Sequence, residues 1–168
     1  MTGHSASVFN VRLANYADPT DAAAIVMLLN AYASDPAGGA EALCEFAQAN
    51  LVAELARRPQ AFSLLAFDGV QPVGLVNCIE GFSTFACKPL VNIHDVAVLA
   101  SHRGRGVGKL MLSAAEQQAR ARGACKLTLE VLTGNLVARK LYEATGFADY
   151  QLDPALGYAS FMQKWLDA

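Results

Sequence analysis

The chain has 168 residues, of which 54% are hydrophobic and 17% charged, a composition typical of one globular domain rather than of a disordered chain. Its formal net charge of −2 argues against general nucleic-acid binding, which usually needs a basic surface. No apolar stretch approaches the length of a membrane span, and the N-terminus lacks a signal-peptide pattern. We therefore expect a cytoplasmic protein with neither a nucleic-acid nor a membrane partner.

The cysteines and histidines do not form a metal-binding pattern. The cysteines are scattered without Cys-x-x-Cys spacing, and neither His4 nor His102 has a second ligand at a helical or strand spacing. We expect no metal site and no disulfide framework, but four small buried thiols. These are Cys44, Cys78, Cys87 and Cys125.

The first third of the chain predicts one strand and two helices. Residues 7–14 alternate in polarity, as a strand does. The cluster Asp-Pro-Thr-Asp at 18–21 is typical of a helix start, and apolar residues at helical spacing predict a helix over about 20–33. The run SDPAGG at 34–39 ends that helix. A second helix is expected over about 40–57.

The middle of the chain reads as a strand-rich region. Two strands are expected over 61–67 and 72–82, and Asp68-Gly69 between them is a hairpin signal. Residues 83–89 follow as a loop. The strand expected over 90–99 is apolar almost throughout, which favours burial on both faces of a sheet.

The last part predicts alternating helices and strands. A helix from Val107 to Arg122-Gly123 leads to a strand over 125–132, which completes a β-α-β unit. A helix over 135–145 and a last strand over 158–166 follow. Neither a linker nor an internal repeat interrupts the order, so we expect a single mixed α/β domain over 1–168.

A glycine-rich turn, SHRGRGVGKLML, precedes the helix expected from Val107. Its glycines permit close approach of a phosphate, its cations add positive charge, and the helix N-terminus adds its dipole. A bound pyrophosphate is the interpretation that this combination favours. The residues concerned are Arg103, Gly104, Arg105, Gly106, Gly108 and Lys109.

Two familiar phosphate motifs fit this turn poorly. Gly108-Lys109 matches the end of a Walker A loop, but Leu110 replaces its hydroxyl residue and Arg103 stands where its first glycine should be. A dinucleotide fingerprint needs Gly-x-Gly-x-x-Gly near the start of a β-α-β unit. Here the spacing is Gly-x-Gly-x-Gly, and the preceding hundred residues have another organisation, although Glu130 does supply an acid on the next strand.

A third motif, Arg/Gln-x-x-Gly-x-Gly/Ala, is met by Arg103, Gly106 and Gly108 and resembles the coenzyme A pyrophosphate loop of the GNAT superfamily of N-acetyltransferases. A second segment, NLVARKLYEATGF, resembles the other signature of that family. The resemblance is strong over residues 90–150. Its matching positions in the second segment are Asn135, Ala138, Tyr142, Gly146 and Phe147.

The resemblance implies a fold of about seven mostly antiparallel strands flanked by four helices. It also implies acetyl-CoA as co-substrate, with direct attack by a primary amine in a ternary complex. Backbone groups of Val96, Ala97 and Val98 would hold the pantetheine arm. The pyrophosphate would lie on Arg103, Gly104, Arg105, Gly106, Val107, Gly108 and Lys109. Asn135 and Ala138 would contact the cofactor, although Asn135 would also serve as a helix N-cap.

The resemblance also suggests the proton-transfer groups. Tyr142 would donate a proton to the departing thiolate, since a phenol with its ordinary pKa of about 10 suits that task. Glu130, on the strand expected over 125–132, and Asp95 are both candidate bases. Asp95 would otherwise be an acid at a strand bulge, and His94 beside it is expected to be packed and hydrogen-bonded.

The sequence favours an N-acetyltransferase enzyme but leaves its acceptor open. Asp35, Glu80 and Asp95 would favour a cationic amine, whether a small molecule or a protein side chain. A homodimer is suggested by resemblance only. The alternative to an enzyme is a non-catalytic acyl-CoA-binding or sensor module on the same fold. A nucleotide phosphotransferase is disfavoured because the Walker hydroxyl residue is missing.

Overall fold

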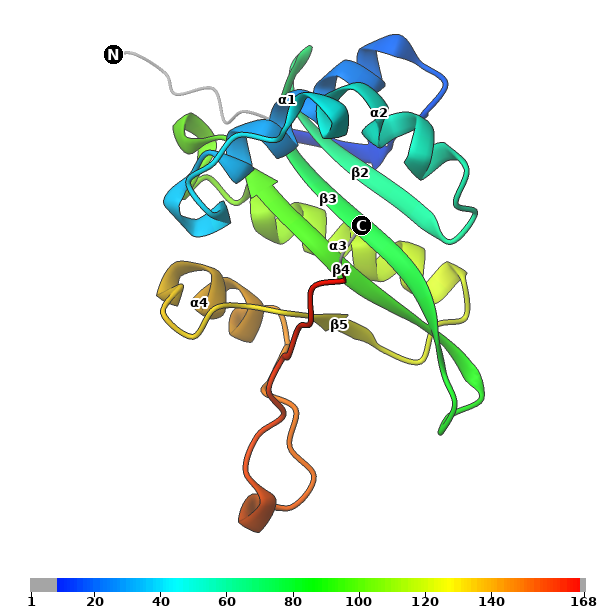
Figure 1. Cartoon of the computed structure of the whole chain (residues 1–168), viewed down its shortest axis with the longest axis vertical. Helices are drawn as coiled ribbons and strands as arrows, with labels where there is room; N and C mark the ends of the chain where they lie inside the picture. The colour runs from blue at the N-terminus through cyan, green and yellow to red at the C-terminus, as the bar shows by residue number, and fades with distance from the viewer. Residues whose placement is uncertain (1–8, 167–168) are drawn as a thin grey trace, which may run out of the picture. The chain divides into compact units, whose positions relative to one another are not determined.

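Five strands form one sheet in the part of the chain that the computed structural model describes, residues 9–166 (Figure 1). Their spatial order is β1-β2-β3-β4-β5, with antiparallel pairing except between β4 and β5, which are parallel. The strands are β1 (Phe9–Leu13), β2 (Ala61–Asp68), β3 (Gln71–Ser83), β4 (Lys88–Val98) and β5 (Leu127–Leu129). This confirms the mixed α/β class, although about seven strands had been expected.

The contacts divide the chain into two compact units, Met1–Leu129 and Glu130–Ala168. The first unit holds the sheet and three α-helices, and the second holds one. The helices are α1 (Pro19–Ala33), α2 (Glu45–Ala56), α3 (Val107–Ala121) and α4 (Leu136–Ala144). The single domain over 1–168 stays a prediction. No helix in residues 9–166 is long and apolar enough to cross a membrane.

The start of α1 follows from its sequence. The Asp18 carboxylate accepts hydrogen bonds from the backbone N–H groups of Thr20 at 2.7 Å and Asp21 at 3.4 Å, as an N-cap does. Pro19 occupies the first turn, where its missing N–H costs nothing. The predicted helix over about 20–33 is confirmed.

The second helix starts later than the expected residue 40. Asp35 caps a short 3₁₀ turn over Pro36–Gly38, and Gly39 and Ala40 then take left-handed φ values of 118° and 59°. A right-handed helix cannot run through such residues. Helix α2 therefore begins only at Glu45.

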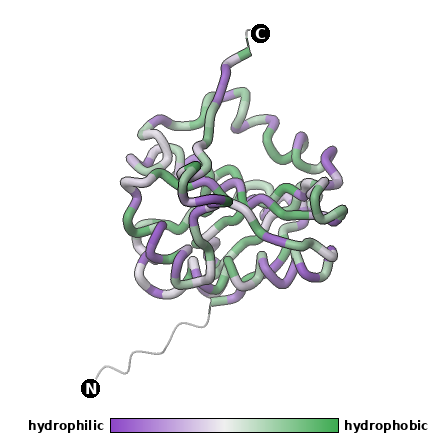
Figure 2. Tube along the Cα trace, turned by 90° about the horizontal axis from the view of Figure 1, so that it is seen from below, coloured by the Kyte–Doolittle hydropathy of each residue, from purple (hydrophilic) through white to green (hydrophobic). Residues whose placement is uncertain are grey.

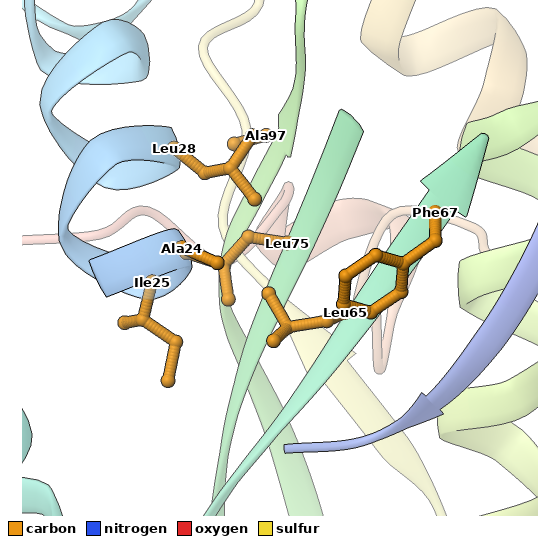
Figure 3. Close-up of a cluster of buried hydrophobic side chains, with 7 residues drawn as sticks. All are labelled: Ala24, Ile25, Leu28, Leu65, Phe67, Leu75 and Ala97. Carbon is orange, nitrogen blue, oxygen red and sulfur yellow. The ribbon is translucent and has the colours of Figure 1, made fainter. Parts of the chain in front are cut away.

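Helices cover both faces of the sheet in the first unit. On one face, Leu65, Leu75 and Ala97 of the strands pack against Ala24, Ile25 and Leu28 of α1 (Figure 3). Residues of α2 pack around the same cluster. Gly74, the neighbour of Leu75, faces Met111 of α3 on the other side, because successive residues of a strand point to opposite faces. The alternation of apolar and polar residues can be followed along the trace in Figure 2.

Gly74 lies where α3 packs closely on the sheet. A Cβ atom there would lie 2.8 Å from Met111 Sδ and 3.2 Å from Val107 Cγ1. We expect Gly74→Val to lower the free energy of unfolding by roughly 1–3 kcal/mol, because it overpacks this face. Denaturant unfolding measures the change. The control is Gly81→Val, since a Cβ at Gly81 meets Leu90 only at 3.4 Å; an equal loss in both variants would contradict the packing argument.

Three sequence predictions fail in the described residues. No strand forms over 158–166, where Phe161 and Trp165 are exposed, so their interpretation as core residues is wrong. Subunit contact through them stays a prediction.

The cysteines were expected to be buried, and burial is observed for Cys78, where it raises the pKa of the thiol to about 12. The other three cysteines are exposed, and all four are free thiols.

Candidate functional site

The glycine-rich turn leads into α3 through two left-handed glycines. Gly104 has φ of 74°, and Gly106, the N-cap residue, has φ of 86°. A Cβ atom at either position would meet nothing within 4 Å. The first helical hydrogen bond runs from the Leu110 N–H to the Gly106 carbonyl at 3.1 Å, and no side chain of the described residues caps the helix. The preceding amides of the first turn are therefore available to an anion.

The two arginines of the turn are engaged within the chain. The Arg103 guanidinium donates to the Val98 carbonyl at 3.0 Å and to the Asp35 carboxylate at 2.9 Å. Arg105 donates to Asp68 at 3.2 Å. These contacts fix the turn to β4 and to the β2–β3 hairpin. The cofactor contacts of Arg103 and Arg105 stay predictions.

His102 anchors the same turn from inside. Its ring is buried, with Nδ1 at 2.9 Å from the Ser101 hydroxyl and Nε2 at 3.4 Å from Asp68. Its edge also meets the Phe9 ring, with centroids 6.3 Å apart. The observed neighbours of His102 are therefore packing and hydrogen-bonding partners.

The outer edge of β4 is open beyond its short contact with β5. Leu127–Leu129 pair only with Val91–Ile93 of β4. In the described residues, no strand pairs with this edge of Val96–Val98, whose other edge pairs with β3. Strand β4 therefore has backbone groups of Val96 on that edge that a bound extended chain can use, whereas the Val98 carbonyl already accepts a hydrogen bond from Arg103.

A β-bulge in β4 sets the direction of Asp95. Asn77 pairs with Asp95, but its neighbour Cys78 pairs with Ile93, so His94 is the extra residue. The bulge puts Ile93 and Asp95 on opposite faces of the sheet, although they are two residues apart. Asp95 thus lies on the α1 face. His94 is exposed, so the prediction that it is packed is wrong.

The Asp95 carboxylate differs from the other two acids expected to favour a cation. Asp35 pairs with Arg103 at 2.9 Å, and Glu80 pairs with Arg122 at 3.4 Å. Asp95 has no ion pair with the described residues and accepts a hydrogen bond from the Asn77 amide at 2.9 Å. It is half-buried. Of the three acids, Asp95 is therefore the one whose charge is not neutralised by a basic side chain.

The second unit carries the remaining predicted residues. Asn135 is the N-cap of α4 and accepts a hydrogen bond from the Ala138 N–H at 3.2 Å, which confirms its capping role. Tyr142 is half-buried on α4, and its ring meets Phe147 edge to face at a centroid distance of 6.0 Å. Glu130 lies just after β5 and is exposed, so its expected place within a strand is wrong. The cofactor contacts and catalytic roles of these residues stay predictions.

Sequence reasoning missed the polar residues behind Asp95. Ser63 and Asn77 are buried on β2 and β3, and Tyr16 and Tyr32 lie half-buried near them. Burial, together with the nearby charge of Asp95, raises the pKa of Tyr32. A polar residue inside each of two apolar strands was the available signal for Ser63 and Asn77.

Comparison with known proteins identifies the family. The sequence profile of the acetyltransferase (GNAT) family matches residues 25–147, the larger part of the chain. The chain belongs to this family. The predicted GNAT-superfamily N-acetyltransferase is therefore confirmed, and an acyltransferase enzyme with it.

This GNAT acetyltransferase is similar to several bacterial relatives. It is 33% identical over 139 residues to the N-acetyltransferase YhfO of Bacillus subtilis (strain 168), and this alignment covers 79% of this chain and 87% of the relative. It is 46% identical over 57 residues to YycN of the same organism, covering 34% and 36%. It is 38% identical over 87 residues to streptothricin acetyltransferase of Streptomyces lavendulae, covering 50% and 46%. The last two matches thus span less than half of each relative.

Solved structures share the fold at low sequence identity. A probable acetyltransferase superimposes with a TM-score of 0.78 at 20% identity, covering 95% of this chain and 99% of the other. AAC(6')-Iy in complex with the bisubstrate analogue CoA-S-monomethyl-acetylneamine gives a TM-score of 0.75 at 18% identity, covering 95% and 100%. These likenesses establish the fold of the GNAT acetyltransferase.

Proposed function

We propose that this GNAT acetyltransferase moves the acetyl group of acetyl-CoA to a cationic primary amine, by direct attack in a ternary complex. The observation that carries the proposal is the N-terminus of α3, where a left-handed glycine stands in place of a capping side chain. The similarity in fold to a protein solved with a CoA bisubstrate analogue supports CoA as the acyl carrier.

The residues of the turn fit a diphosphate. The space beside Gly104 and Gly106 is open, and the amides of the first turn and the Lys109 side chain supply donors and positive charge. The open edge of Val96–Val98 suits the amide groups of a pantetheine arm, which would bind it as another strand would. Asn135 and Ala138 stay predicted cofactor contacts.

The chemistry needs a neutral amine and a protonated leaving group. Asp95 would bind the ammonium form and take its proton, directly or through water, and Glu130 is the other candidate base. A carbon–nitrogen bond forms as the carbon–sulfur bond of the thioester breaks. Tyr142 would give its phenolic proton to the sulfur, which leaves as a thiol, and the second proton lost by the amine nitrogen would restore the phenol, directly or through water.

Charge and the relatives both support a small cationic amine as the acceptor. Asp95 is the acid without an ion pair, and a cationic amine would supply one. Streptothricin acetyltransferase is named for a small molecule, and AAC(6')-Iy was solved with the bisubstrate analogue CoA-S-monomethyl-acetylneamine. We therefore favour a small cationic amine over a protein side chain. A homodimer and a cytoplasmic location stay predictions.

A pair of glycine variants tests the anion site. Gly106 and Gly123 lie next to opposite ends of α3, have φ of 86° and 73°, and both border open space. Alanine at either position brings the same backbone strain, of the order of 1 kcal/mol. Only Gly106→Ala puts a methyl group at the proposed phosphate. We expect it to weaken CoA binding by roughly tenfold, a difference of about 1.4 kcal/mol, with Gly123→Ala close to the unsubstituted protein.

Isothermal titration calorimetry measures the affinities of the two variants and of the unsubstituted protein for CoA and for pantetheine. The loss in Gly106→Ala should appear for CoA and be absent for pantetheine, which lacks the diphosphate. Equal affinities for CoA in the two variants would contradict the placement of the diphosphate. No binding of CoA to the unsubstituted protein at millimolar concentration would remove the proposed function.

A further inference from the structure

A row of polar side chains crosses the α1 face of the sheet and ends at Asp95. Ser63, Asn77 and Asp95 stand in register on β2, β3 and β4. The Ser63 hydroxyl donates to Asn77 Oδ1 at 2.6 Å, and Asn77 Nδ2 donates to Asp95 Oδ2 at 2.9 Å. The Tyr16 hydroxyl lies 2.8 Å from Ser63 Oγ.

The chemistry of these groups gives the row one direction. An ionised carboxylate only accepts hydrogen bonds, so the Asn77 amide must turn its nitrogen to Asp95 and its oxygen to Ser63. Ser63 has a single hydroxyl proton, which goes to Asn77. Tyr16 must then be the donor to Ser63. Every donor in the row therefore points toward Asp95.

The row occupies a place that apolar side chains would fill at lower cost. Ser63 is 1% exposed and Asn77 4% exposed. Two residues along the same strands and on the same face, Leu65 and Leu75 belong to the apolar core. Burial of polar groups is costly unless each is hydrogen-bonded, and fully bonded networks impose a fixed geometry. What the row fixes here is the Asp95 carboxylate.

That carboxylate needs a support because of its place in the chain. Asp95 follows the bulge residue His94, and bulged strands are locally irregular. Its Oδ2 atom is held by Asn77, whereas its Oδ1 atom receives no hydrogen bond from the described residues. We propose that Asn77 is a positioning residue, held in turn by Ser63 and Tyr16, that aims the Asp95 carboxylate at the acceptor amine. This inference rests on the proposed role of Asp95 in the reaction.

The test is a double-mutant cycle on the full chain. The donor is acetyl-CoA, and the amine probes are spermidine, lysine, neamine and a lysine-containing peptide. Asn77→Leu removes the donor to Asp95 at similar volume. With the best probe, we expect kcat/KM for the amine to fall by roughly tenfold to a hundredfold, with a raised KM and an unchanged affinity for CoA. In an Asp95→Asn background, Asn77→Leu should change kcat/KM by less than about twofold, since its effect passes through the carboxylate.

Two further variants separate positioning from stability. Asn92→Leu removes another hydrogen bond between strands, from Asn92 to Thr128 at 3.2 Å, and should leave kcat/KM within about twofold. Ser63→Ala keeps the Asn77–Asp95 bond but removes the support of the amide. It should show a smaller loss in the same direction, and it takes the place of Asn77→Leu in the cycle if that variant does not fold.

The outcomes distinguish the inference from the proposed function. Equal losses on Asn77→Leu with and without the Asp95 carboxylate would overturn the positioning role alone. An unchanged kcat/KM in Asp95→Asn would remove the role of Asp95, and the positioning role with it, while CoA binding still reports on the rest of the function. Transfer to none of the four probes would overturn both.

Discussion

Tyr142→Phe should lower kcat by roughly a hundredfold, because loss of the phenolic proton leaves the thiolate to depart unprotonated. The affinity for CoA should stay within about twofold, since the missing hydroxyl acts on the leaving group in the transition state rather than on binding. The change leaves the ring in place on α4, so its edge-to-face contact with Phe147 is kept. A fall in kcat is then attributable to the hydroxyl.

The assay should follow the ultraviolet absorbance of the thioester. Three exposed thiols would react with the usual thiol reagents and obscure the release of CoA; these are Cys44, Cys87 and Cys125. The control is Tyr158→Phe, since Tyr158 lies exposed in the same unit and has no proposed role. An unchanged kcat in Tyr142→Phe would show that another group, or water, protonates the sulfur.

The features of the fold and of the site that the sequence could predict are formed by residues close together in the chain. Asp18 caps α1 through the amides of Thr20 and Asp21, and Gly106 precedes α3 with a left-handed φ. Such features need only a few consecutive residues, so local spacing predicts them. The glycine-rich turn, the helix after it and the N-cap at Asn135 were accessible for the same reason.

The surroundings of Asp95 depend instead on strand register. The bulge at His94 turns Asp95 to the α1 face, and Ser63 and Asn77 lie 32 and 18 positions earlier in the chain. Nothing in the local pattern of β4 gives the position of an extra residue, because a bulge is defined by the partner strand. A periodicity of two over 90–99 would have put Asp95 on the face of Ile93.

The residues at which strands end also could not be predicted from the local sequence pattern. Leu127–Leu129 form β5, but Glu130 does not continue it, although the apolar alternation runs on to Val131. The segment over 158–166 has a strand-like composition and forms no ladder with the described residues. A strand exists only with a hydrogen-bonding partner, so its length is decided by its neighbour rather than by its own residues.

Asp21→Ala should lower the free energy of unfolding by roughly 3 kcal/mol. The Asp21 side chain is 2% exposed and accepts two hydrogen bonds of 2.7 Å from the Arg12 guanidinium and one of 2.8 Å from the Asn15 N–H. Removing one partner of a buried ion pair costs about 3–5 kcal/mol of stability. The lower end of that range applies here because Arg12 is 44% exposed and its guanidinium can turn to water. Asp18→Ala is the control, since loss of that N-cap should cost only about 1 kcal/mol.

The effect of Asp21→Ala should depend on pH in a defined direction. The hydrogen bonds from Arg12 hold the pKa of the Asp21 carboxyl below its ordinary value of 3.8, against the opposing effect of burial. A carboxyl whose pKa is lowered by folding stabilises the native state above its unfolded pKa, and this contribution is lost as the pH falls through the folded pKa. The difference in unfolding free energy between the unsubstituted protein and Asp21→Ala should therefore be constant near neutral pH and shrink below about pH 4. Exposed carboxylates such as Glu54 titrate alike in both proteins and cancel in that difference. Urea unfolding at a series of pH values measures it, and a difference that grew on acidification would mean that Asp21 is held in its protonated form.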